Sequence, residues 1–188
     1  MDILDVIHGE HQDVAAKLGE ADGCDPGDAR LAELAKEIST ALLTHTKIEE
    51  RLFYSKLRER SKDDDELVDV YEAYTEHDVV GHLIDLLKSG RKPDEKFKAE
   101  MQVLGESVKH HVAEEESKVF KIARELMDQS ERDDLGEQWA KARKRADAQA
   151  PGGRGRKSGA RKKARSDKKA RGAKKVRGAK KTASKKRR

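Results

Sequence analysis

Apolar residues recur every three to four positions in four stretches of the chain, and each stretch contains a histidine where another apolar residue would be expected. These stretches cover residues 4–18, 31–52, 67–87 and 97–126. Polar breaks separate them, and none shows the alternating pattern of a half-buried strand. We therefore predict an all-α fold built on an up-and-down antiparallel four-helix bundle.

The C-terminal part of the chain follows a different pattern. A shorter amphipathic stretch with Leu135, Trp139 and Ala142 predicts a short additional helix that packs outside the bundle or trails it. The residues after Ala150 include almost nothing apolar larger than alanine, so they cannot bury enough surface to offset their ordering entropy. The predicted organisation is a bundle domain over residues 1–148 and a disordered tail over residues 149–188.

Charge divides the chain at the same place. Residues 151–188 contain 19 Lys or Arg and one acid, a net charge of +18, whereas residues 1–150 carry a net charge of −13. The tail repeats paired lysines with small spacers and lacks aromatic residues, so it resembles the C-terminal arms of linker histones and of lysine-rich nucleoid proteins. We expect residues 151–188 to bind nucleic acid through its phosphates, without sequence preference. The alternatives are a solvated solubility tail, or one bound to acidic lipid or to the acidic bundle.

Two motifs recur at a displacement of 66 residues. The pattern EHxxV occupies residues 10–14 and 76–80, and the pattern HxxxEE occupies residues 45–50 and 111–116. An aromatic residue follows each HxxxEE motif at the same distance, Tyr54 in one half and Phe120 in the other. The equal displacement predicts two copies related by a two-fold axis, which would bring all four motifs to one level of the bundle.

Inward positions of four antiparallel helices converge, so the four histidines of these motifs are expected to point at one another: His11, His45, His77 and His111. A glutamate four residues after a histidine lies about 40° away around the helix, so both side chains can reach one centre. Glu49 and Glu115 would then be buried, with no Lys or Arg on the inward faces to compensate them. A bound metal ion is the simplest counter-charge.

The same residues resemble a known family. The succession H, HxxxE, H, HxxxE over about residues 1–148 is similar to the signature of hemerythrin-like HHE proteins. The resemblance implies a centre of two irons bridged by two glutamates, with these ligands: His11, His45, Glu49, His77, His111 and Glu115. Imidazole and carboxylate ligands suit iron independently of the family, and they suit zinc and manganese almost as well.

Two departures separate this chain from the oxygen-carrying hemerythrins. Those proteins have a second histidine on the third helix, four residues after the first one, and this chain has Gly81 at that position. They also place the last carboxylate five residues after its histidine, whereas Glu115 follows His111 by four. The chain is therefore more similar to the regulatory and stress-linked branch. A missing ligand leaves an open coordination position, where oxygen, nitric oxide or peroxide could bind.

Four further side chains lie near the predicted site. His8, one turn before His11, is expected at the edge of the site. Tyr54 either binds the metal, donates a hydrogen bond to a bound ligand, or is an ordinary aromatic at the end of the bundle. His82 and His110 are expected to face away from the centre.

Composition predicts a cytoplasmic protein. The chain opens with acids where a signal peptide carries basic residues, and no apolar run approaches the roughly 18 residues of a membrane span. The single cysteine, Cys24, fits a reducing compartment. We expect a metal-binding sensor or scavenger associated with the nucleoid. A di-iron oxidase or peroxide-destroying enzyme and a structural nucleoid protein are the alternatives, and the oligomeric state stays open.

Overall fold

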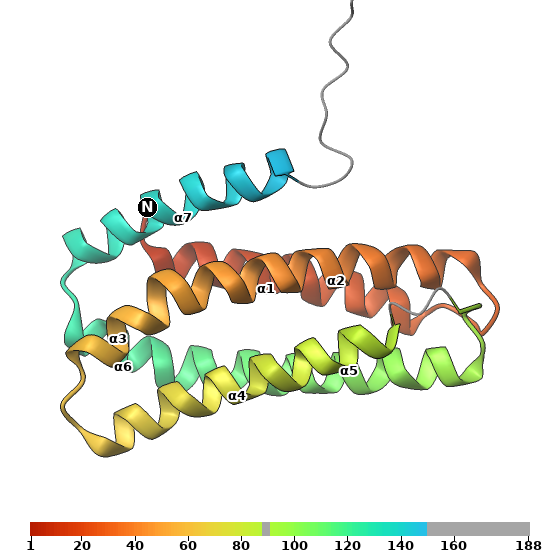
Figure 1. Cartoon of the computed structure of the whole chain (residues 1–188), viewed down its shortest axis with the longest axis horizontal. Helices are drawn as coiled ribbons and strands as arrows, with labels where there is room; N and C mark the ends of the chain where they lie inside the picture. The colour runs from red at the N-terminus through yellow and green to blue at the C-terminus, as the bar shows by residue number, and fades with distance from the viewer. Residues whose placement is uncertain (88–90, 150–188) are drawn as a thin grey trace, which may run out of the picture. The chain divides into compact units, whose positions relative to one another are not determined.

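The computed structural model describes residues 1–87 and 91–149, and every regular element within them is a helix. Four long helices form the bundle: α1 (Ile3–Asp22), α2 (Ala29–Glu49), α4 (Asp64–Leu87) and α5 (Glu95–Glu114). Helix α1 packs against α2 and α5, and α4 packs against α5 and α2, so the four helices form an up-and-down ring (Figure 1). The predicted all-α bundle is confirmed.

Aspartates set the starts of three bundle helices. The side chains of Asp2, Asp28 and Asp94 accept hydrogen bonds from the backbone N–H groups two or three residues later, at 2.8–2.9 Å. Each carboxylate satisfies a donor that has no partner within the helix and places negative charge at the positive end of the helix dipole. The turn before α2 also needs a glycine, because Gly27 has a φ of 94°.

Two of the predicted helices contain a π-helical turn next to their HxxxEE motifs. Helix α2 continues through η1 (Glu50–Tyr54) into α3 (Ser55–Arg60), and α5 continues through η2 (Glu115–Val119) into α6 (Phe120–Leu126). A π turn holds more residues than an α turn, so it rotates the following side chains around the helix axis. Tyr54 and its neighbour Phe53 are both fully buried as a result.

The apolar core consists of two clusters. One cluster lies at the end of the bundle where α3, α6 and α7 meet, and it includes Ile7, Phe53, Leu57 and Trp139. The other fills the opposite end between α1, α2, α4 and α5, and it includes Ile38, Ile84 and Leu104. The layer between the two clusters is polar, because it contains the buried histidines and glutamates of the repeated motifs.

A further helix, α7 (Gln129–Gln149), packs on α1, α2 and η1 and lies along the α1–α2 side of the bundle (Figure 1). Its buried face includes Leu135, Trp139 and Ala142, as the sequence predicts. At 21 residues it is as long as α2, not short. Gly136 permits close packing, because a Cβ atom there would lie 1.9 Å from the carbonyl oxygen of Met1.

The predicted tail lies outside the described residues, apart from Gln149, which ends α7. Within residues 1–87 and 91–149, none of the helices combines the length and the apolar content that a bilayer span requires.

Candidate metal centre

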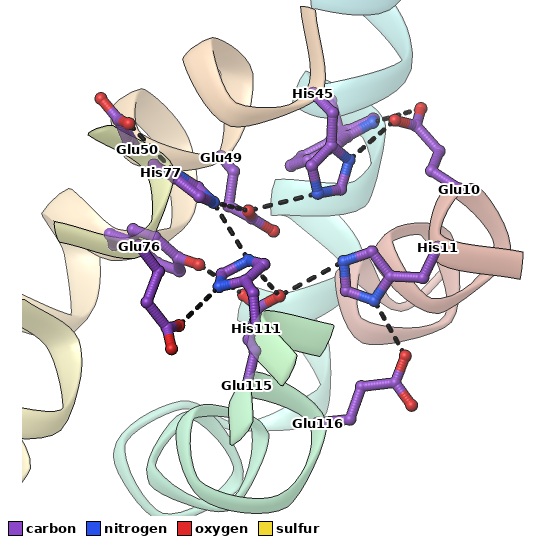
Figure 2. A network of polar contacts seen from close by, with 12 residues as sticks. Glu10, His11, His45, Glu49, Glu50, Glu76, His77, His111, Glu115 and Glu116 are labelled. Atoms are coloured by element: carbon purple, nitrogen blue, oxygen red, sulfur yellow. Dashed lines mark hydrogen bonds and ion pairs between the residues drawn. The ribbon is translucent and has the colours of Figure 1, made fainter. Parts of the chain in front are cut away.

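The repeated motifs meet at one level of the bundle (Figure 2). Helices α1 and α4 each supply a histidine. The continuous helices α2–η1 and α5–η2 each supply a histidine and a glutamate. All six predicted ligands are buried: His11, His45, Glu49, His77, His111 and Glu115. Periodicity predicted this burial, because each residue occupies a position on the apolar stripe of its helix.

Each inner carboxylate lies between one histidine from each half of the bundle. Oε2 of Glu49 is 3.2 Å from Nε2 of His45 and 3.3 Å from Nε2 of His77. In the equivalent arrangement, Oε2 of Glu115 is 3.3 Å from Nε2 of His11 and 3.7 Å from Nε2 of His111. The two-fold relationship expected from the 66-residue displacement therefore extends to individual side-chain atoms.

The inner atoms have the geometry of metal donors rather than of a closed hydrogen-bond network. The two oxygens of Glu49, Oε2 of Glu115 and Nε2 of both His11 and His45 have no hydrogen-bond partner among the described residues. Unpaired buried polar atoms are costly, and a cation between them would satisfy them together. The donor atoms form two groups, and within each group all of them lie within 4.8 Å of one another. One group comprises His11, His45 and Glu49, and the other comprises Glu49, His77 and His111.

A second ring of carboxylates holds the outer nitrogens of the histidines. Nδ1 of His11, His45, His77 and His111 lies 2.8–3.0 Å from a carboxylate oxygen of Glu116, Glu10, Glu50 and Glu76 respectively (Figure 2). With Nδ1–H donating outward, each Nε2 presents its lone pair to the centre. The sequence interpretation gave these four glutamates no role, although they are the remaining acidic residues of the repeated EHxxV and HxxxEE patterns.

In the metal-free protein, protons on His45 and His77 supply counter-charge for the inner carboxylates. Burial alone would lower the pKa of His45, but Glu49 and Glu10 raise it to about 10. The pKa of His77 is raised to about 9, against the effect of burial, by Glu49 and Glu50. Burial would raise the pKa of Glu49, but the nearby His45 and His77 hold it well below its usual value. A metal ion must displace these protons, so its binding is coupled to pH.

A small cavity adjoins the centre on the side of the α1, α2, α4 and α5 cluster. Its volume is about 20 Å³, and the four histidines line it together with apolar side chains such as Val14, Leu42, Val80 and Val108. A cavity of this size holds about one water-sized molecule. The centre can therefore accept a very small uncharged molecule without opening the bundle.

Side chains predicted near the site occupy different places. His8 is half-exposed, and its Nδ1 lies 2.9 Å from Glu116, so it borders the site through that carboxylate. The buried Tyr54 hydroxyl donates to Oε1 of Glu115 at 2.9 Å. His82 faces solvent. His110 is 66% exposed, but its Nε2 also lies 3.3 Å from Glu76.

Comparison with known proteins agrees with this geometry. The model of the family described as the hemerythrin HHE cation binding domain matches residues 2–123, well over half of the chain. The chain belongs to this family. No curated protein and no solved structure matches it. The hemerythrin HHE domain binds metal cations, and this one contains buried His/Glu groups that could hold a metal ion. Helix α7 lies beyond the residues that match the HHE family.

Proposed function

We propose that this protein is a non-haem iron protein that senses or scavenges oxygen, nitric oxide or peroxide and is tethered to DNA by its basic tail. Two irons per chain would be held by the six inner residues: His11, His45, Glu49, His77, His111 and Glu115. The chain would accordingly divide into a metal-binding domain, residues 1–148, and a Lys/Arg-rich tail, residues 149–188, of which residues 151–188 would bind DNA. Its place in the cell would be the nucleoid.

The observation that carries the metal assignment is the position of the two inner carboxylates. Each lies 3.2–3.7 Å from Nε2 atoms of both halves. Both oxygens of Glu49 and Oε2 of Glu115 have no hydrogen-bond partner among the described residues. Two neighbouring ions would each be held by two of these imidazoles, with Glu49 and Glu115 as the carboxylate ligands. Imidazole and carboxylate donors suit iron, zinc and manganese. Zinc has no redox chemistry, and iron is the metal that the resemblance to hemerythrin-like proteins implies.

Size and polarity at the centre support a small ligand. When bound, iron supplies an ion that reacts with small oxygen and nitrogen species. The surrounding residues limit which molecules can reach the ion. The cavity beside the histidines has a volume of about 20 Å³, and Val14, Leu42 and Val80 make one side of it apolar. Bulky molecules would therefore be excluded, because the cavity holds only about one water-sized molecule.

Charge supports the tethering role. Residues 151–188 carry 19 basic residues and one acid, while residues 1–150 carry a net charge of −13. A segment of such charge density binds duplex phosphates by releasing counterions, and the acidic domain would be held away from the backbone. Metal chemistry would then take place close to DNA.

Metal analysis of the purified chain, together with an absorption spectrum, tests the assignment. We expect about two irons per chain. His45→Ala and His111→Ala should each lose about one metal ion, because each removes one imidazole from a different half. If both variants keep the wild-type metal content, the assigned constellation is wrong.

The same preparation separates a sensor from an enzyme. If the protein is a sensor or stoichiometric scavenger, the iron-loaded protein should form one stable adduct with peroxide, seen as a lasting spectral change, and should then consume no more peroxide. Continued peroxide consumption over many equivalents would instead establish the enzyme alternative. Purified protein without stoichiometric metal would favour a structural nucleoid protein.

A further inference from the structure

Helix α7 reaches the candidate metal centre through one carboxylate. The indole Nε1 of Trp139 donates to Oε1 of Glu10 at 3.0 Å, and Nη1 of Arg143 donates to Oε2 of the same residue at 3.0 Å. Nδ1 of His45 also lies 3.0 Å from Oε2 of Glu10. Glu10 is therefore held by three donors, two of which come from α7.

The equivalent carboxylate in the other half has weaker support. Glu76 contacts Nδ1 of His111 at 2.8 Å, as Glu10 contacts His45, but its second neighbour is His110 at 3.3 Å. His110 is 66% exposed, whereas Trp139 is only 1% exposed. The two-fold relationship of the halves thus ends at this layer, because α7 packs on α1, α2 and η1.

Trp139 also restrains the His45 ring directly. The two rings are 5.3 Å apart between centroids and meet edge to face at 67°. A rotation of the His45 ring out of this position would break its contact with Glu10 and disturb its packing against the buried indole.

From this asymmetry we propose that Trp139 and Arg143 are positioning residues that make the metal position of the α1–α2 half, with His11 and His45, slower to exchange than that of the α4–α5 half. The inference rests on the proposed two-metal function. Carboxylates behind a metal-bound histidine fix its ring and tautomer, and losing such support typically lowers metal affinity about 10- to 100-fold. Helix α7, which lies beyond the matched family segment, would thus make two otherwise similar metal positions different. One would retain its ion, and the other would exchange it readily.

Metal release measures the difference. The full-length protein is loaded anaerobically with Fe²⁺ and mixed with excess chromogenic chelator. The wild-type protein should release about one ion in a fast phase and about one in a slow phase. Arg143→Met and Trp139→Phe should each accelerate the slow phase about tenfold or more and leave the fast phase unchanged. Arg143→Lys, which keeps a cation near Glu10, should restore much of the slow phase.

Two backgrounds assign the phases to positions. In His111→Ala, where only the α1–α2 position is complete, Arg143→Met should accelerate release of the remaining ion. In His45→Ala, where only the α4–α5 position is complete, the same change should have no effect. Lys141→Met is the matched control on α7, because Lys141 pairs with Glu137 at 3.3 Å and does not touch Glu10.

Several results would overturn the proposal. They are a single release phase in the wild-type protein, an unchanged slow phase in both Arg143→Met and Trp139→Phe, or an equal acceleration in Lys141→Met. Arg143 is partly exposed, so its replacement should leave the fold intact even if Trp139→Phe does not. Failure of the proposed metal site is a different outcome, since His45→Ala and His111→Ala would then both keep the wild-type metal content.

Discussion

The Tyr54 hydroxyl donates a 2.9 Å hydrogen bond to Oε1 of Glu115, and the Tyr54 ring stacks on His77 with 5.3 Å between centroids. The first half of the bundle thereby supports an inner carboxylate of the second half. The equivalent residue of the second half is Phe120, which has no hydroxyl to return the contact. Burial and the charge of Glu115 raise the pKa of Tyr54 well above its usual value, so the phenol remains a donor at physiological pH.

Replacing Tyr54 with phenylalanine should destabilise the metal-free protein. The change removes the donor to Oε1 of the buried Glu115, and a hydrogen bond to a charged group contributes roughly 1.5–3 kcal/mol. Urea denaturation measures the loss of unfolding free energy. Tyr74→Phe is the control, because the Tyr74 hydroxyl donates to the neutral backbone oxygen of Glu50 and should cost less. Equal losses would mean that the charge of Glu115 adds nothing to the bond.

The metal-free protein should lose stability as the pH rises from 6.5 to 8. The folded-state pKa of His45 is about 10 and that of His77 about 9, both above the unfolded value of 6.5. Their stabilisation is fully present below pH 6.5 and is lost as the pH rises through the folded values. The loss should be on the order of 2 kcal/mol per histidine over this interval.

Urea denaturation at the two pH values checks this dependence, and a flat profile for the metal-free protein would contradict it. The lowered pKa of Glu49 acts in the other direction only in acid, where its stabilisation is lost as the pH falls through the folded value. Metal-loaded protein provides the comparison. Because the ion replaces the histidine protons, the stabilisation by metal should increase over the same pH interval.

Gly81→His should add an imidazole beside the α4–α5 metal position. Gly81 lies one turn after His77, and a Cβ atom there would meet nothing within 4 Å. We expect the variant to retain its metal and to bind azide more weakly in the ferric state, because the added ring would compete for the open position. Gly81→Ala is the control: it should gain about 1 kcal/mol of helix stability without changing azide binding. Unchanged azide binding in Gly81→His would place the open position elsewhere.

Ending the chain after Ala150 should separate DNA binding from metal binding. For the full chain, a plot of log affinity for duplex DNA against log salt concentration should be a straight line that falls by about 0.9 per phosphate neutralised. We expect about 6–10 phosphates to be engaged. The shortened chain, with a net charge of −13 over residues 1–150, should not bind DNA and should keep its metal spectrum. DNA binding by the shortened chain would refute the assignment of this role to the tail, and loss of its metal would show that the tail supports the centre.

The sequence alone determined the four bundle helices, the up-and-down architecture and the buried residues of the candidate centre. Helical periodicity assigns each residue to a face, and a histidine or glutamate on an apolar face is visible without coordinates. The equal displacement of 66 residues predicted in addition that the four motifs lie at one level of the bundle. Burial of His11, His45, Glu49, His77, His111 and Glu115 therefore followed from local pattern and symmetry.

Tertiary structure alone decided which side chains support these six. Glu10 contacts His45 of a neighbouring helix rather than the adjacent His11, and Glu116 contacts His11 of the neighbouring helix α1. Such pairings depend on the axial offset and rotation of packed helices, which periodicity within one helix does not specify. The same holds for Trp139, which lies 129 positions from Glu10 in the sequence and meets it only because α7 folds back along α1.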